Sequence, residues 1–234
     1  GETFFGVKAV EAYIHETAAP KLLGRDPLEI ERISLDLTPY VGFSGSGAET
    51  RGRSAIDVAL WDVFGKVTEQ PVFQLLGGLA RKKIRTYNTC AGYRYVRNRP
   101  DWDTSDWGLE SPSEGPYEDL DAFLNRPDEL ALDLLGQGIT GMKIWPFDHA
   151  AKDSDGYYIS NASLDRCLEP FRKIRKAVGD KIDIMVEFHS LWRLPAALKI
   201  AEALEPYNPY WYEDPVRMDS LPALARFAEA TRVP

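Results

Sequence analysis

Side chains suited to acid–base and metal chemistry follow three short apolar segments of the chain. Lys143 and Trp145 end the first segment, Glu187 and His189 the second, and Glu213 the third. Because side chains alternate along a strand, Glu187 and His189 are expected to point the same way, as are Lys143 and Trp145. If the three segments are neighbouring strands, an ammonium group, two carboxylates and an imidazole meet at their ends.

This combination predicts chemistry at the carbon next to a carboxylate. Two carboxylates from neighbouring strands suit a hard divalent ion such as Mg²⁺, which binds a few carboxylates together with water and substrate oxygens. Such an ion can stabilise the enolate that forms when the α-proton of a carboxylate substrate leaves. Lys143 would add positive charge there, or act as a base if its pKa is lowered. His189 would donate a proton to a departing β-hydroxyl.

Each residue also has a structural interpretation. Lys143 alone would be a solvated strand end, Glu213 part of a loop before Pro215, and His189 a buried histidine with a satisfied ring. Their occurrence on three successive strand ends favours the functional interpretation. We assign structural roles to the other two histidines, His15 and His149.

Two loops are candidates for covering a site. Residues 93–117 are polar and rich in aromatic side chains, and they either line a pocket or pack on the surface. Residues 40–52 are rich in Gly and Ser and read as a loop. Its residues Tyr40, Phe43 and Ser44 either cap the site or belong to a simple connection between helices.

The spacing of apolar residues predicts two kinds of organisation. Up to residue 80 the chain is helical, with helices over 8–23, 26–37 and 54–67 and a short one from Pro71 to Gly77. Beyond Arg81, strands over 84–89, 139–145, 182–188 and 210–213 alternate with helices over 127–135, 164–178, 194–204 and 221–230. Such alternation means parallel strands with helical crossovers, in a doubly wound sheet or in part of a (β/α) barrel. The absence of a glycine-rich phosphate loop after the first strand favours the barrel.

Composition excludes several classes of function. The 234 residues carry a net charge of -8, which argues against binding to nucleic acid or to an anionic membrane surface. No apolar run approaches the ~20 residues that span a bilayer. Cys90 and Cys167 fit neither a disulfide framework nor a zinc site, so we expect a cytoplasmic protein. The chain starts at Gly1 and stops in a strand-like Val233–Pro234, and we expect the protein to continue at both ends.

Several motifs resemble one known family. Residues 54–62 (SAIDVALWD), with Lys66, Pro71 and the sequence LLGG at 75–78, resemble the helical-cap signature of the mandelate racemase and muconate lactonizing family of the enolase superfamily. Gly1-Glu2-Thr3 resembles the end of that family's N-terminal sheet, and Glu213-Asp214-Pro215 resembles its acidic metal-binding strand end. The sequence VEFH at 186–189 is similar to galactonate-type acid-sugar dehydratases.

The resemblance implies a fold and a set of roles. Residues 1–80 would be part of an N-terminal α+β capping domain, and residues 81–234 the first part of a modified (β/α)7β TIM-like barrel. Glu187 and Glu213 would be the first two Mg²⁺ ligands, His189 the general acid, and Lys143 the residue at the second strand's catalytic position. The 40–47 loop would close over the substrate, and the residues expected to contact it are Tyr40, Phe43, Ser44 and Trp145. The third metal ligand and the general base would follow Pro234, and the intact protein would be a homo-oligomer.

Two departures from the family pattern refine the prediction. Trp145 stands where the racemases carry a second lysine, which disfavours two-base racemisation and favours dehydration. Glu187 stands where an aspartate is usual. We therefore expect a Mg²⁺-dependent dehydratase that converts a sugar acid, a small carboxylate, into a 2-keto-3-deoxy acid, with residues 1–234 alone inactive. The alternatives are a racemase, epimerase or cycloisomerase of the same family, or a non-catalytic binding protein with a barrel fold.

Overall fold

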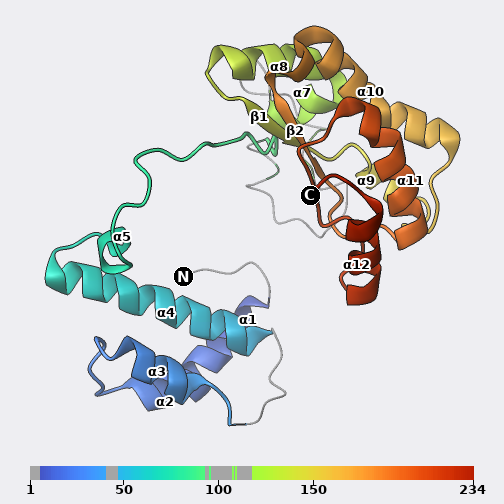
Figure 1. Cartoon of the computed structure of the whole chain (residues 1–234). Coiled ribbons are helices and arrows are strands. Elements are labelled where there is room, and N and C mark those ends of the chain that lie inside the picture. Colours follow the sequence, from blue (N-terminus) through green and yellow to red (C-terminus); the bar gives the residue numbers. More distant parts are fainter. Residues whose placement is uncertain (1–5, 41–46, 93–94, 96–106, 108, 110–117) are drawn as a thin grey trace. The chain divides into compact units, whose positions relative to one another are not determined.

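The protein is described by a computed structural model covering residues 6–40, 47–92, 95, 107, 109 and 118–234 (Figure 1). Its chain divides into two compact units, residues 1–84 and residues 85–234, and each is described by itself. The expected strand near Glu2, the residues Phe43 and Ser44, and most of the 93–117 loop lie outside the described residues.

The first unit is helical where it is described. Its elements are α1 (Val7–Ala12), a π-helical turn (Tyr13–Ala18), α2 (Ala19–Leu22), α3 (Ile30–Leu37), α4 (Ala48–Thr68) and α5 (Val72–Leu75). Ala18, Ile33 and Leu37 form a small core on which Ile56 and Leu60 of α4 pack.

Two helix starts in this unit differ from the prediction. Helix α3 begins at Ile30 because the Asp26 side chain accepts a hydrogen bond from the Leu28 N–H and holds a turn there. Helix α4 begins at Ala48, six residues before the predicted start at Ser54, so the last part of the expected 40–52 loop is helical.

A parallel sheet organises the second unit. Its strands β1 (Gly141–Ile144), β2 (Asp183–Glu187) and β3 (Trp211–Glu213) pair in chain order. On the free side of β1, the predicted strand over 84–89 is wrong in extent, because Asn88 alone bridges to β1, through hydrogen bonds with Gly141 and Lys143. Beside β3, the Tyr212 N–H donates to the Pro234 carbonyl at 2.8 Å. Each strand therefore lies next to the one that precedes it in the chain, and the order does not reverse within the described sheet.

Helices cover the sheet in the same order. They are α7 (Asp119–Asn125), α8 (Pro127–Gly136), α9 (Asp148–Lys152), α10 (Asn161–Val178), α11 (Leu194–Leu204) and α12 (Leu221–Ala230). Helix α8 packs on α10, α10 on α11 and α11 on α12, so they follow one another around the strands (Figure 1). From Asn88 through β1, β2 and β3 to Pro234 the chain order shows no reversal of the kind that marks a doubly wound sheet, as expected for a barrel segment. Helices α7 and α9 were not predicted.

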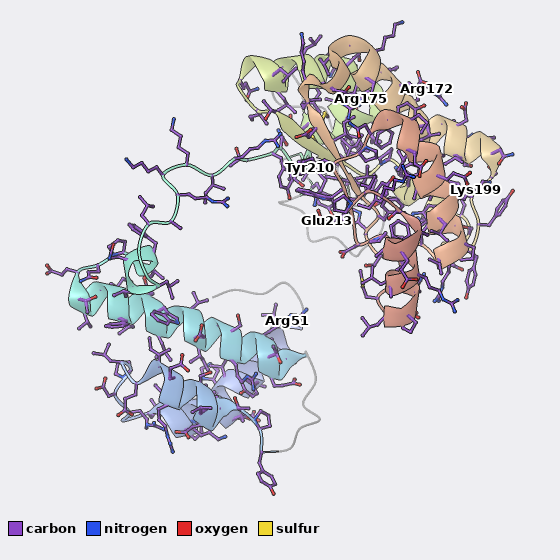
Figure 2. The ribbon with its side chains drawn as sticks, in the orientation of Figure 1. Arg51, Arg172, Arg175, Lys199, Tyr210 and Glu213 are labelled. Carbon is purple, nitrogen blue, oxygen red and sulfur yellow. The ribbon has the colours of Figure 1, made fainter. Side chains whose placement is uncertain are left out.

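Two arginines form hydrogen bonds near the N-terminal ends of the strands, at the edge of the sheet opposite the predicted site. The Arg85 guanidinium binds the Thr140 carbonyl at 2.8 Å and the Asp183 carboxylate at 2.5 Å. Arg175 of α10 donates to the carbonyls of Tyr207 and Ile182, both at 2.8 Å, and so ties its helix to the approaches of β2 and β3 (Figure 2).

None of the described helices is long and apolar enough to cross a membrane.

Candidate active site

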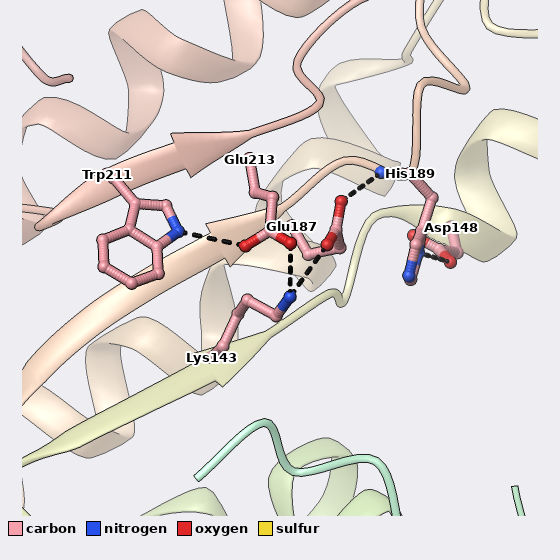
Figure 3. A network of polar contacts seen from close by, with 6 residues as sticks. All are labelled: Lys143, Asp148, Glu187, His189, Trp211 and Glu213. Atoms are coloured by element: carbon pink, nitrogen blue, oxygen red, sulfur yellow. Dashed lines mark hydrogen bonds and ion pairs between the residues drawn. The ribbon is translucent and has the colours of Figure 1, made fainter. Parts of the chain in front are cut away.

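Three of the predicted site residues meet at the carboxyl ends of the strands (Figure 3). Glu187 and Glu213 are register partners at the ends of β2 and β3. The Lys143 Nζ lies 3.0 Å from Glu187 Oε2 and 2.7 Å from Glu213 Oε1. The Lys143 and Glu187 side chains are only 10% and 5% exposed, while that of Glu213 is 35% exposed. The Trp211 indole N–H donates to the other oxygen of Glu213 at 3.2 Å.

The burial and pairing of these groups shift their pKa values in different directions. Burial is the largest influence on Glu187 and raises its pKa. Burial is also the largest single influence on Glu213 and acts to raise its pKa, but the hydrogen bond and the charge of Lys143, together with hydrogen bonds to Glu187 and Trp211, outweigh it and the pKa is lowered. For Lys143, burial acts to lower the pKa, and hydrogen bonds to Glu213 and Glu187 more than compensate, so the pKa is raised. The ammonium thus holds two carboxylates together that would otherwise repel each other.

His189 lies beside this cluster in a strained turn. Strand β2 ends at Glu187, and both His189 and Ser190 adopt left-handed backbone angles, with φ of 50° and 55°. The His189 backbone N–H donates to Glu187 Oε1 at 2.8 Å, and the Ser190 N–H donates to the Asp214 carbonyl at 2.9 Å. The orientation of the His189 side chain is therefore set by this pinned turn, and strand alternation does not apply to it.

The structure adds one residue that the sequence analysis missed. Asp148, at the start of α9, places Oδ2 2.7 Å from His189 Nδ1 and is 5% exposed. Burial raises the pKa of Asp148, while the hydrogen bond with Asp148 raises the pKa of His189 against the effect of burial. One feature of the sequence pointed to Asp148: it lies three residues after Trp145 and follows Pro146, which ends the predicted strand.

Trp145 packs against the His189 ring. Its ring lies edge-on to the imidazole at 5.6 Å between centroids, and Phe123 packs against it at 5.0 Å. Trp107 and Tyr95 complete this group at 6.4 Å and 5.9 Å from Trp145. Trp145 is 2% exposed, and its contact with a substrate stays a prediction. Tyr40, in the first unit, is fully exposed.

A glycine in the loop after α9 packs closely against the backbone that follows the His189 turn. Gly156 has φ of 74°, and its carbonyl accepts a hydrogen bond from the Arg193 N–H at 2.9 Å. A Cβ at this position would lie 1.9 Å from the Leu191 carbonyl oxygen. The two loops can therefore approach this closely only with glycine at position 156.

Gly156→Ala is expected to destabilise the second unit by roughly 3 kcal/mol or more, because the methyl group meets backbone and the left-handed angle adds its own cost. Gly138→Ala is the matched control: it has φ of 81° but no atom within 4 Å of its Cβ position, so a loss of about 1 kcal/mol is expected. Urea unfolding of both variants measures the difference. Equal losses would show that the close approach to Leu191 does not constrain the loop.

The donor set at the strand ends fits a hard cation. Glu187 and Glu213 direct carboxylate oxygens at one positively charged atom, the Lys143 Nζ. Within the described part of the chain, no three His, Cys, Asp or Glu side chains are grouped to hold a metal ion. Two carboxylates match Mg²⁺, which typically takes one or two from the protein and completes its shell with water and substrate oxygens.

Comparisons with known families decide the membership of the chain. Residues 2–77 match the mandelate racemase / muconate lactonizing enzyme N-terminal domain, and residues 128–234 match the enolase C-terminal domain-like family. The chain belongs to the mandelate racemase / muconate lactonizing enzyme family. The β1–β3 unit is accordingly part of this family's barrel, and the doubly wound alternative is excluded.

Solved structures of the family share this fold. An enolase of the mandelate racemase subgroup from Agrobacterium tumefaciens is 52% identical, with a TM-score of 0.80 over 100% of this chain and 54% of that one. Among curated family relatives, a D-galactonate dehydratase from Ralstonia nicotianae is 28% identical over 97% of this chain and 50% of its own length. A D-gluconate dehydratase from Thermoproteus tenax is 28% identical over 95% of this chain and 38% of its own length. The chain thus spans half or less of these curated relatives.

Proposed function

We propose that the protein is an acid-sugar dehydratase, which removes the α-proton of an aldonic or aldaric acid and expels the β-hydroxyl to give a 2-keto-3-deoxy acid. The observation that carries this proposal is the His189 imidazole, fixed by buried Asp148 beside the paired carboxylates Glu187 and Glu213. Relatives named as D-galactonate and D-gluconate dehydratases support the class of substrate.

The cofactor that fits this site is Mg²⁺. Glu187 and Glu213 would hold it, and it would supply the positive charge that makes an α-proton next to a carboxylate acidic. Both carboxylates are already positioned by the chain: the His189 backbone N–H binds one and the Trp211 indole N–H binds the other. In this proposal, the hydrogen bond from the His189 N–H would position the longer side chain of Glu187, where the resemblance leads one to expect aspartate.

His189 and Lys143 take different parts in the reaction. His189, as general acid, gives a proton to the departing β-hydroxyl, a step in which a positioned imidazole contributes about 10²–10⁴-fold in rate. Lys143 lies between the two carboxylates and adds positive charge where the anion develops. The 40–47 loop, with Tyr40, Phe43 and Ser44, and the ring of Trp145 are proposed substrate contacts.

A substrate screen tests the function. The complete reading frame that contains these residues is incubated with a panel of aldonic and aldaric acids and Mg²⁺, and 2-keto-3-deoxy acid is measured. We expect product with at least one acid, and its loss when EDTA is added and recovery with excess Mg²⁺. Deuterium uptake at an α-carbon without any keto acid would overturn dehydration in favour of racemisation or cycloisomerisation. No metal-dependent reaction and no Mg²⁺ binding would favour a binding protein.

A further inference from the structure

Two ring contacts and a constrained backbone orient the His189 imidazole, whose side chain is 34% exposed. Asp148 binds Nδ1, the Trp145 ring abuts it edge-on, and its own backbone is pinned to Glu187 through a strained turn. These contacts oppose a ring flip, which would place Cδ2 where Nδ1 now faces Asp148 and move Nε2 to the position of Cε1. The nitrogen that remains for a reaction is Nε2, across the ring from Asp148.

Asp148 is a buried acid whose side-chain hydrogen bond, among the described residues, goes to His189. Its carboxylate is buried at the start of a five-residue helix, and its second oxygen, Oδ1, has no hydrogen-bond partner among the described residues. Burying a carboxylate costs folding free energy, and the hydrogen bond to His189 offsets part of that cost. Within the described structure, its one side-chain hydrogen bond in the site is to the His189 ring.

We propose that Asp148 is a positioning residue that keeps the hydrogen on His189 Nδ1, so that the imidazolium form gives up its proton from Nε2 and is left as the neutral Nδ1–H tautomer. An ionised carboxylate can accept but cannot donate a hydrogen bond, so the Nδ1 that faces Asp148 carries a hydrogen. The proton that His189 delivers must then leave from Nε2. This inference rests on the proposed function for the reaction, but the orientation of the ring can be measured without it.

The same logic explains why asparagine is the informative replacement. Asp148→Asn keeps the shape of the side chain but lets its NH₂ group donate to Nδ1, which stabilises the opposite tautomer. The matched control is Asp153→Asn, an exposed aspartate at the end of the same short helix.

Two measurements test the proposal. In ¹⁵N-histidine-labelled protein at alkaline pH, long-range ¹H–¹⁵N spectra report the tautomer, and the His189 signals are assigned by their loss in His189→Asn. We expect the Nδ1–H form in the parent protein and in Asp153→Asn, and the Nε2–H form or a mixture in Asp148→Asn. In the dehydration assay we expect kcat of Asp148→Asn to fall roughly 10²-fold or more with KM changed little, while α-proton exchange persists.

The outcomes separate the two proposals. An unchanged His189 tautomer in Asp148→Asn overturns the positioning role, even if the protein is a dehydratase. A loss of kcat accompanied by equal loss of α-proton exchange also overturns it, because that pattern indicates general damage to the site. A changed tautomer in a protein that dehydrates no acid sugar keeps the positioning role and rejects the proposed function.

Discussion

His189→Asn is expected to lower the rate of dehydration by roughly 10²–10⁴-fold while α-proton exchange with solvent deuterium continues. The reason is that His189 serves the departing hydroxyl, whereas a different group removes the α-proton. Asparagine suits the test because it tolerates the left-handed backbone at position 189, where φ is 50°. Product formation and deuterium uptake are followed in the same samples by NMR.

The matched control for this substitution is His149→Asn. His149 is exposed and contacts Trp107 with tilted rings, 4.7 Å between centroids, so its loss should change the dehydration rate by no more than a few-fold. If His189→Asn removes deuterium uptake together with dehydration, His189 takes part in proton abstraction and its assignment as the acid for the leaving group is wrong.

Lys143→Met is expected to destabilise the second unit by about 3–5 kcal/mol, the usual cost of removing one partner from a buried ion pair. Glu187 would be left at 5% exposure without the Lys143 ammonium, and Glu213 would face it directly across the strands. Chemical denaturation measures the effect. Lys176→Met, on the exposed side of α10, is the control and should change stability by no more than about 0.5 kcal/mol.

A double variant separates charge from packing in this prediction. Lys143→Met combined with Glu187→Gln also removes the buried carboxylate that loses its partner in the single variant. The double variant should therefore recover a substantial part of the free energy of unfolding that Lys143→Met loses. If the double variant is as unstable as the sum of the two single ones, the two residues do not interact energetically and the observed contact contributes nothing to folding.

The parts of the fold that were predicted well are those with strong local signals. Helices α11 and α12 begin and end at the predicted residues, because each has a proline in its first turn and a clear apolar face. The three strands were located to within two residues, and the ends of β2 and β3 bring Glu187 and Glu213 together as expected.

What the sequence could not supply was contact between distant segments. Asp148 and His189 are 41 residues apart, and they meet because the chain bends after Pro146 and again in the turn beyond Glu187. No periodicity marks a five-residue helix such as α9. The predicted strand at 84–89 has the right composition, but only Asn88 finds a partner among the described residues, so its extent depends on tertiary pairing.

The left-handed turn at His189 also limits what can replace this residue in evolution or in enzyme design. Backbone angles such as φ of 50° are adopted readily by glycine, and among other residues mostly by asparagine, aspartate and histidine. Few residue types are therefore suited to this position, and three of the four, asparagine, aspartate and histidine, bear a polar side chain. A mutation here that preserves folding changes the chemistry of the site, whereas β-branched residues are disfavoured by the backbone before chemistry is tested. A change of reaction at this position is thus expected to come from replacing one polar side chain by another while the left-handed backbone stays the same.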